Sequence, residues 1–154
     1  DLHRRRHSFP TRRSSDLSAE AEVQKYLKAY DEKHQDFDWA RNMDAHSAGG
    51  RFHRQTGDFQ FYGPGVHGVI EVKEVKHDFR VPHGNLNENS AGKLWKRQLA
   101  GGEIVIAVYH STSKKWRVSD LTRFRKREGG SWDLSDLYEF HACREALDSL
   151  KLFL

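Results

Sequence analysis

The chain of 154 residues is 36% hydrophobic and 12% aromatic, and it carries 26 Lys and Arg against 22 Asp and Glu. This composition is typical of a globular protein, and no apolar run approaches the roughly 18 residues that a membrane span needs. We therefore expect a soluble protein with no membrane partner and with enough residues for one domain with its own core. The single cysteine, Cys143, excludes an internal disulfide and a cysteine-rich zinc site, and it favours a reducing cytoplasm.

Residues 1–17, DLHRRRHSFPTRRSSDL, have the composition of a basic arm that binds DNA phosphates. However, HSFPTRRSSDL resembles the translation of a widely used sequencing-adapter oligonucleotide, and DLH resembles the translation of its upstream part. We therefore interpret residues 1–17 as an artefactual, disordered tail and residues 18–154 as a single domain. Without the five Arg and two Asp of the tail, 21 Lys and Arg face 20 Asp and Glu, and the net charge falls to +1. Overall basicity therefore does not indicate nucleic-acid binding, and only local clusters of Lys and Arg remain.

The first half of the chain has the pattern of a helix followed by a hairpin. Ser18 is a suitable N-cap for a helix over 19–34, with Val23, Leu27 and Tyr30 on one face. A short strand within 36–45 and a loop at 46–57 follow. Strands over 58–62 and 66–75, joined by the turn GPG, then form the predicted hairpin.

The second half predicts further strands and two helices. Pro82 and Gly84 break the chain before a helix within 87–102, whose packed face would hold Leu94, Trp95, Gln98 and Leu99. Residues 103–110 predict a central strand, residues 116–124 an edge strand and residues 133–150 a final helix. This order predicts an α/β protein with a mixed β-sheet flanked by helices.

The stretch GVIEVKEVKHDF, residues 68–79, contains two Glu-x-Lys triplets behind an apolar lead-in. Since alternate residues of a strand share a face, Glu71 and Lys73 point one way and Glu74 points the other. Asp58, at the start of the partner strand, is expected near Glu71 across the hairpin. Two carboxylates beside a lysine suit a hard divalent cation with oxygen ligands, such as Mg²⁺. The alternative is a solvated cross-strand pair, the common role of Glu-x-Lys on a strand.

Together these residues resemble the signature of the PD-(D/E)XK nuclease superfamily, in which an acidic residue precedes an apolar lead-in and Glu-x-Lys. Here Asp58 precedes Glu71 and Lys73, and the first helix resembles the family pattern of a Glu followed by apolar residues three and seven positions later. The segment EVKEVKHDFRVP is similar to the stretch after the motif in bacterial and phage Holliday-junction resolvases. The resemblance extends over about residues 18–125 and implies a restriction-endonuclease-like α/β fold.

The resemblance also implies a role for each matched residue. Asp58 and Glu71 would bind Mg²⁺, for which Mn²⁺ is a substitute, together with the main-chain carbonyl of Val72. Lys73 would position the attacking water, and Glu20 would support the metal site. The implied activity is a metal-dependent endonuclease that cuts phosphodiester bonds in DNA, above all in branched DNA. Enzymes of this kind act as homodimers, in the cytoplasm of a bacterium or of a phage-infected host cell.

Three basic residues are candidates for DNA contacts. Lys76 follows the motif directly, and Arg51 and Arg54 lie on the loop before the expected metal ligands. The alternatives are an ordinary surface lysine and a mobile polar loop.

Two positions depart from the family pattern or leave it ambiguous. Gly57 stands where the family often has Pro, and Glu22 competes with Glu20 for the role of the first-helix carboxylate. Two other functions stay open. One is a related nuclease directed by sequence, strand end or flap, and the other is a non-catalytic DNA-binding module.

Overall fold

The computed structural model describes residues 18–42 and 57–152. The interpretation of residues 1–17 and the predicted DNA contacts of Arg51 and Arg54 therefore lie outside the described residues. The helices and strands are, in chain order, α1 (Ala19–Lys33), β1 (Asp38–Arg41), β2 (Phe59–Gly63), β3 (Val66–Val75), β4 (Arg80–Pro82), α2 (Glu88–Leu99), β5 (Glu103–His110), β6 (Lys115–Ser119), β7 (Ser131–Asp133) and α3 (Cys143–Asp148). No helix in the described part of the chain is both long and apolar enough to cross a membrane.

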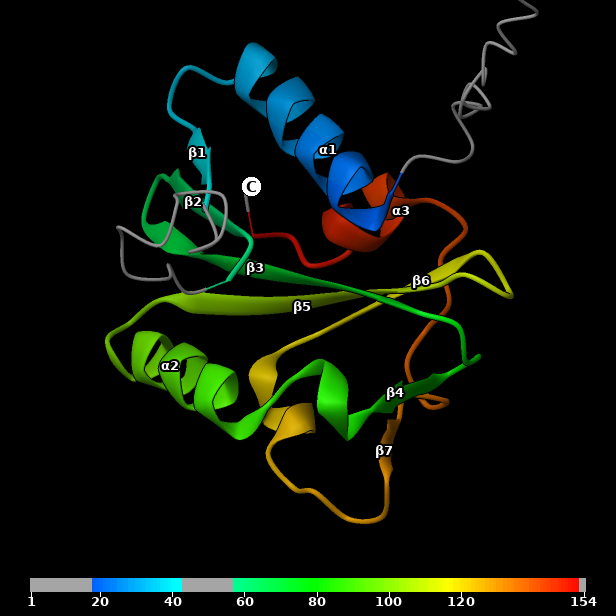
Figure 1. Ribbon diagram of the computed structural model, residues 1–154. Coiled ribbons are helices and arrows are strands. Elements are labelled where there is room, and N and C mark those ends of the chain that lie inside the picture. The colour runs from blue at the N-terminus through cyan, green and yellow to red at the C-terminus, as the bar shows by residue number, and fades with distance from the viewer. Residues whose placement is uncertain (1–17, 43–56, 153–154) are drawn as a thin grey trace, which may run out of the picture.

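The main sheet has five strands in the order β1-β2-β3-β5-β6 (Figure 1). β3 and β5 are parallel, and every other neighbouring pair is antiparallel. The parallel pair needs a crossover, which contains α2, whereas the predicted hairpin joins β2 and β3 directly. In that hairpin Phe59 lies opposite Ile70, and β4 and β7 form a separate two-stranded sheet. The predicted mixed sheet flanked by helices is confirmed.

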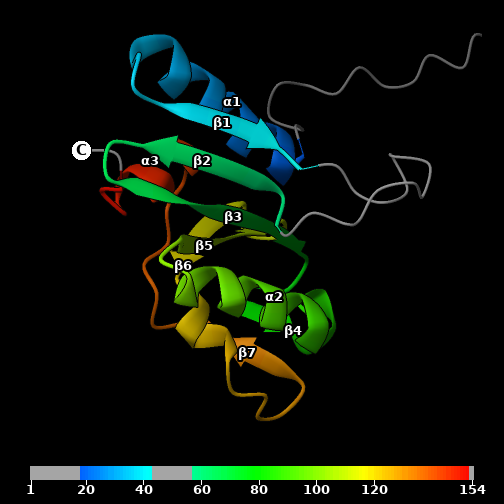
Figure 2. The same cartoon turned by 90° about the vertical axis from the view of Figure 1, so that its left-hand side faces the viewer.

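The sheet separates two apolar cores, because successive side chains of a strand point to opposite faces. Figure 2 shows α1 on one side of the sheet and α2 with β4 and β7 on the other. The first core contains α1, α3 and one face of the sheet, and its largest fully buried side chains are Leu27, Phe59, Phe61, Ile70 and Trp116. The second core lies beneath α2 and includes Val69, Leu94, Ile106, Leu121 and Trp132. α1 begins as predicted, since the Ser18 side chain accepts a hydrogen bond from the Ala21 N–H at 3.2 Å.

The prediction of a final helix over 133–150 was wrong for most of its length, since α3 begins only at Cys143. The Asp133 carboxylate accepts a hydrogen bond from the Ser135 N–H at 2.8 Å, which favours a turn over a helix. Further on, the main chain of Phe140 exchanges two hydrogen bonds with Trp116 of β6, at 2.8 and 2.9 Å. This segment therefore satisfies backbone groups at the edge of the sheet, which a helix in the same place would leave unpaired.

Two other local predictions need correction. The edge strand predicted over 116–124 ends at Ser119, because the Asp120 carboxylate accepts from the Thr122 N–H at 3.0 Å and caps a 3-10 turn at Leu121–Phe124. Leu99 was expected on the packed face of α2 but is 71% exposed, whereas Leu94 is buried. Five residues along an α-helix correspond to a rotation of roughly 140° beyond one full turn, so the two leucines lie on different faces.

Burial predicts very different effects for two Leu→Ala substitutions in helices. Leu27 is fully buried in the first core, so Leu27→Ala should lower the free energy of unfolding by about 3 kcal/mol. Leu99→Ala serves as the matched control and should change it by less than about 0.5 kcal/mol. Urea denaturation of the two variants measures both values, and similar losses would contradict the described packing of α1 and α2.

Candidate active site

Two charged side chains of β3 lie between two buried valines on the same face of the strand. Val69 and Val75 on this face belong to the core beneath α2, and Glu71 and Lys73 lie between them in the alternation. The side chains of Glu71 and Lys73 are only 13% and 18% exposed, and the Lys73 Nζ lies 2.7 Å from a carboxylate oxygen of Glu71. Withdrawing charges from water is unfavourable even when they are paired, so apolar side chains would be the ordinary choice here.

Asp58 is held against β3 by its own main chain and side chain. Its N–H donates to the carbonyl of Ile70 at 3.0 Å, and its Oδ2 accepts a hydrogen bond from the Val72 N–H at 2.6 Å. On the other side, the carbonyl of Asp58 accepts from the Asn42 N–H at 2.8 Å. Because Ile70 and Val72 flank Glu71, the hydrogen bonds to these two residues hold Asp58 beside it, and the charge of Glu71 acts on Asp58; the structure thus brings the two predicted carboxylates together.

The electrostatics of Asp58 show that its negative charge is poorly compensated. Burial is the main cause that raises its pKa, the nearby charge of Glu71 is the next, and together they raise it to about 7. The hydrogen bond from Val72 and the ammonium of Lys73 act in the opposite direction without cancelling these effects. Two carboxylates thus share one ammonium, an arrangement that a further cation would stabilise.

The oxygen atoms at this site match the preferences of Mg²⁺. In a strand the N–H and C=O of one residue point to the same side, so the carbonyl of Val72 lies on the edge where its N–H meets Asp58. Two carboxylates and a carbonyl are hard oxygen ligands, and Mg²⁺ usually keeps several waters in addition. Among the described residues, no three His, Cys, Asp or Glu side chains surround a common metal position. The chain can therefore supply part of the coordination shell, with water completing it.

The two candidate carboxylates of α1 point to different sides of the helix. Glu20 contributes to the raised pKa of Asp58, and its carboxylate lies 2.9 Å from the guanidinium of Arg41. Glu22 instead accepts a hydrogen bond from the Trp116 side chain, and its pKa is raised mainly by burial. Of the two, Glu20 is the carboxylate on the Asp58 side, although it stands outside the immediate pair.

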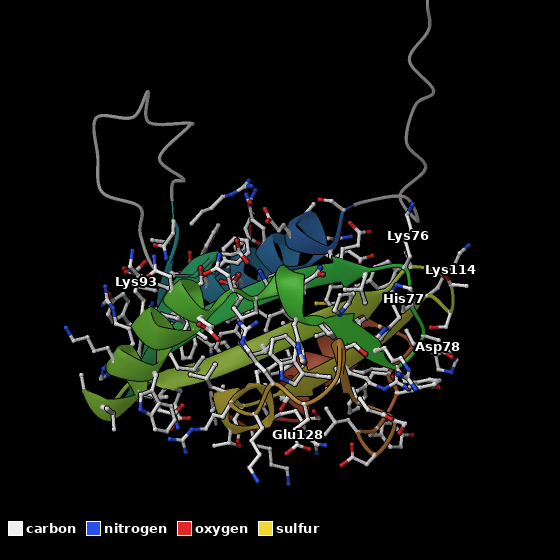
Figure 3. The ribbon with its side chains drawn as sticks, turned by 60° about the horizontal axis from the view of Figure 1, so that its bottom comes forward. Lys76, His77, Asp78, Lys93, Lys114 and Glu128 are labelled. Carbon is white, nitrogen blue, oxygen red and sulfur yellow. The ribbon has the colours of Figure 1, made fainter. Side chains whose placement is uncertain are left out.

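The second triplet of the Glu-x-Lys repeat does not join this site. Glu74 is exposed on the opposite face of β3, where its charge is felt by Glu22 of α1. Lys76 is exposed just beyond β3, and its carbonyl accepts a hydrogen bond from the Thr112 hydroxyl. Figure 3 shows Lys76 beside His77 at the outer end of the sheet. Its predicted contact with DNA stays a prediction.

Gly57 adopts a conformation that the sequence did not reveal. Its φ of +78° is closed to Pro, whose ring fixes φ near −65°, and a Cβ here would lie 2.0 Å from the Val69 Cγ1. Its carbonyl also accepts a hydrogen bond from the Asn42 side chain at 3.1 Å. In this chain, therefore, the backbone beside Asp58 favours glycine for steric reasons, and Pro does not fit it.

Comparison with known proteins identifies a similar fold but does not identify the activity. No protein-family model and no curated protein matches the chain. Among solved structures, the chain is similar to Hjc, a Holliday junction resolvase from the archaeal hyperthermophile Archaeoglobus fulgidus, with a TM-score of 0.54 and 17% sequence identity. The match covers 79% of this chain and 95% of that one. The fold is thus nuclease-like, as the sequence predicted.

A second glycine makes it possible to separate the stability cost of the contact between a Cβ at position 57 and Val69 from the cost of a positive φ alone. Gly65 has a similar φ of +69°, but a Cβ there would meet nothing within 4 Å. Gly65→Ala therefore reports backbone strain alone, whereas Gly57→Ala adds overlap with Val69. We expect Gly57→Ala to lower the free energy of unfolding by about 1–3 kcal/mol more than Gly65→Ala does. Urea denaturation of both variants measures the difference, and equal losses would contradict the close contact.

The raised pKa of Asp58 predicts a pH-dependent gain in stability for Asp58→Asn. The native carboxyl has a pKa of about 7 against 3.8 for an unperturbed Asp, so the folded state binds the proton more tightly. The wild-type protein should therefore lose stability as the pH rises from about 4 to 7, a loss that the variant avoids. In EDTA, Asp58→Asn should nearly match the wild type near pH 4 and exceed it at pH 8 by on the order of 4 kcal/mol.

Thermal or urea unfolding at both pH values provides the measurement. Added Mg²⁺ should narrow the difference at pH 8, because the cation stabilises only the wild-type carboxylates. If the stability difference between Asp58→Asn and the wild type were the same at both pH values, the pKa of Asp58 would not be raised in the folded protein.

Proposed function

We propose that this protein is a metal-dependent endonuclease that cuts phosphodiester bonds in DNA. The observation that carries the proposal is the placement of Asp58, Glu71 and Lys73 together in a largely buried position on a nuclease-like fold. Asp58 and Glu71, with the Val72 carbonyl, would hold Mg²⁺, and Mn²⁺ would substitute for it. A binding module that only contacts phosphates gains nothing from converging carboxylates, since these repel the DNA backbone.

The chain itself positions the reacting groups. Two backbone hydrogen bonds fix Asp58, so its carboxylate needs no reorganisation when it takes up a cation. The Lys73 ammonium lies 2.7 Å from the Glu71 carboxylate, and with Glu71 serving as a metal ligand it would be available to hydrogen-bond the attacking water. Bound Mg²⁺ supplies positive charge that offsets the negative charge developing on the phosphate. Lys73 would direct the water for an in-line attack on phosphorus, opposite the leaving oxygen.

Branched DNA is the proposed substrate, and the structural similarity to a Holliday junction resolvase supports this choice. Symmetric cleavage of a four-way junction needs two sites, so the proposal includes a homodimer. Sequence-directed, end-directed or flap-directed cleavage is the alternative within the same chemistry.

The decisive experiment compares the two Glu-x-Lys triplets in a cleavage assay. The full chain is incubated with a four-way junction, a flap and a plain duplex, each with Mg²⁺ or with EDTA. We expect cleavage only with Mg²⁺ and fastest on the junction. Glu71→Gln and Lys73→Met should each lower the rate at least about 100-fold, because each removes a group that acts on the reacting phosphate or water.

Glu74→Gln is the matched control, since Glu74 belongs to the neighbouring triplet but is exposed on the opposite face. It should cleave at the wild-type rate, and circular dichroism should show that all three variants are folded. Wild-type rates for Glu71→Gln and Lys73→Met would exclude the proposed site. Salt-dependent DNA binding without any Mg²⁺-dependent turnover would instead favour the non-catalytic module.

A further inference from the structure

A second cavity, apart from the carboxylate site, lies between α1, the end of the sheet and the segment that leads into α3. Its volume is about 580 Å³. The α1 side chains that line it recur every three or four residues, so they form one stripe of the helix: Glu22, Lys25, Tyr26, Ala29 and Lys33. Glu20 is not part of this stripe. The cavity lies on the α1 and α3 side of the sheet, whereas Glu71 and Lys73 lie on the α2 side.

Four residues with positively charged side chains, from three parts of the chain, line this cavity. Lys25 and Lys33 come from α1, Lys114 from the β5–β6 turn and Arg144 from α3, and all four are exposed to solvent. Figure 3 shows Lys114 at the outer end of the sheet. Among the described lining residues the carboxylate is that of Glu22, which the Trp116 side chain already engages by a hydrogen bond. The charge of the cavity is thus complementary to an anion.

The walls of the cavity are aromatic and held in place. Tyr26 and Tyr109 are half-buried, and the Tyr109 ring packs against buried Trp116 with ring centroids 5.1 Å apart. The Tyr26 hydroxyl donates to the Asp148 carboxylate at 2.7 Å, which ties α1 to α3. On the opposite side, the main-chain hydrogen bonds between Trp116 and Phe140 fix the segment that leads into α3. The tyrosine rings that line the cavity are therefore held in place before any ligand binds.

We infer that this cavity binds a nucleotide, with the phosphate among the Lys and Arg side chains and the base against the tyrosine rings. Its volume lies within the roughly 300–1,000 Å³ of small-molecule sites. Lys and Arg bind phosphate through charge-assisted hydrogen bonds, and aromatic rings stack on any base. A free nucleoside monophosphate and the terminal nucleotide of a DNA strand both present this chemistry. The inference does not rest on the proposed cleavage activity.

The test measures binding to the full chain in EDTA, where cleavage cannot interfere. The ligands are dAMP, deoxyadenosine and inorganic phosphate, and the dissociation constant of each is measured by calorimetry or by NMR. We expect dAMP to bind at least about tenfold more tightly than either part alone, because the cavity contacts both base and phosphate. The double variant Lys25→Ala/Arg144→Ala should weaken dAMP binding at least about tenfold.

Two further variants distinguish binding in this cavity from non-specific attraction of the phosphate to surface cations. Lys28→Ala removes an exposed lysine of α1 that does not line the cavity, so it should bind dAMP like the wild type. Ala29→Phe keeps every charge but fills the cavity, so it should weaken binding. Equal effects of Lys28→Ala and Lys25→Ala/Arg144→Ala, or phosphate binding as tight as dAMP binding, would overturn the inference.

Competition with single-stranded DNA identifies the source of the nucleotide. Displacement of dAMP by a linear 5′-phosphorylated oligonucleotide, but not by a circular one, assigns the site to a strand end. Displacement by neither assigns it to a free nucleotide, and equal displacement by both would contradict a cavity that takes one nucleotide. Glu71→Gln should bind dAMP normally in every case, so failure of the cleavage proposal would leave this result unaffected.

Discussion

The candidate site depends on the position of one carboxylate, because Asp58 is tied to the main chain of β3 and not only to other side chains. Its N–H and its Oδ2 hydrogen-bond to Ile70 and Val72, the residues on either side of Glu71. The two carboxylates thus cannot separate without breaking the edge of the β2–β3 hairpin. Burial and the nearby charge of Glu71 raise the pKa of Asp58, and the single ammonium of Lys73 does not cancel these two effects. The fold keeps together charges that would otherwise move apart, as a preorganised cation site requires.

α1 has three roles, which its helical period keeps on separate faces. Val23 and Leu27 are fully buried in the core and anchor the helix on the sheet. Glu20 faces the carboxylate site, and the stripe from Glu22 to Lys33 faces the second cavity. Because Glu20 and this stripe belong to one helix that is packed in the core, their relative positions are fixed by core packing and not by a loop.

The sequence predicted the parts of the structure that depend on periodicity and on a local motif. Alternation in β3 correctly separated Glu74 from Glu71 and Lys73, and the GPG turn correctly predicted the hairpin between β2 and β3. The sequence could not show the conformation of Gly57, because its φ depends on the approach of Val69 from the neighbouring strand. It also failed for the segment before α3, where helical propensity was overridden by main-chain pairing between Phe140 and β6. These errors share a cause, since each depends on contacts between residues distant in the sequence.

For the proposed binding of DNA, the local distribution of charge matters more than the net charge of the chain. Residues 18–154 have a net charge of +1, so long-range attraction to DNA is weak and is screened within about 8–10 Å at physiological salt. Lys76 lies near Lys114 because the β3–β4 loop and the β5–β6 turn are joined by hydrogen bonds from Ser111 and Thr112. These hydrogen bonds bring exposed cations together at one end of the sheet, while Asp58 and Glu71, which share the ammonium of Lys73, lie elsewhere beside β3. Carboxylates repel phosphate until a cation neutralises them, so under the proposed function the binding of DNA and of the metal at the carboxylate site would reinforce each other.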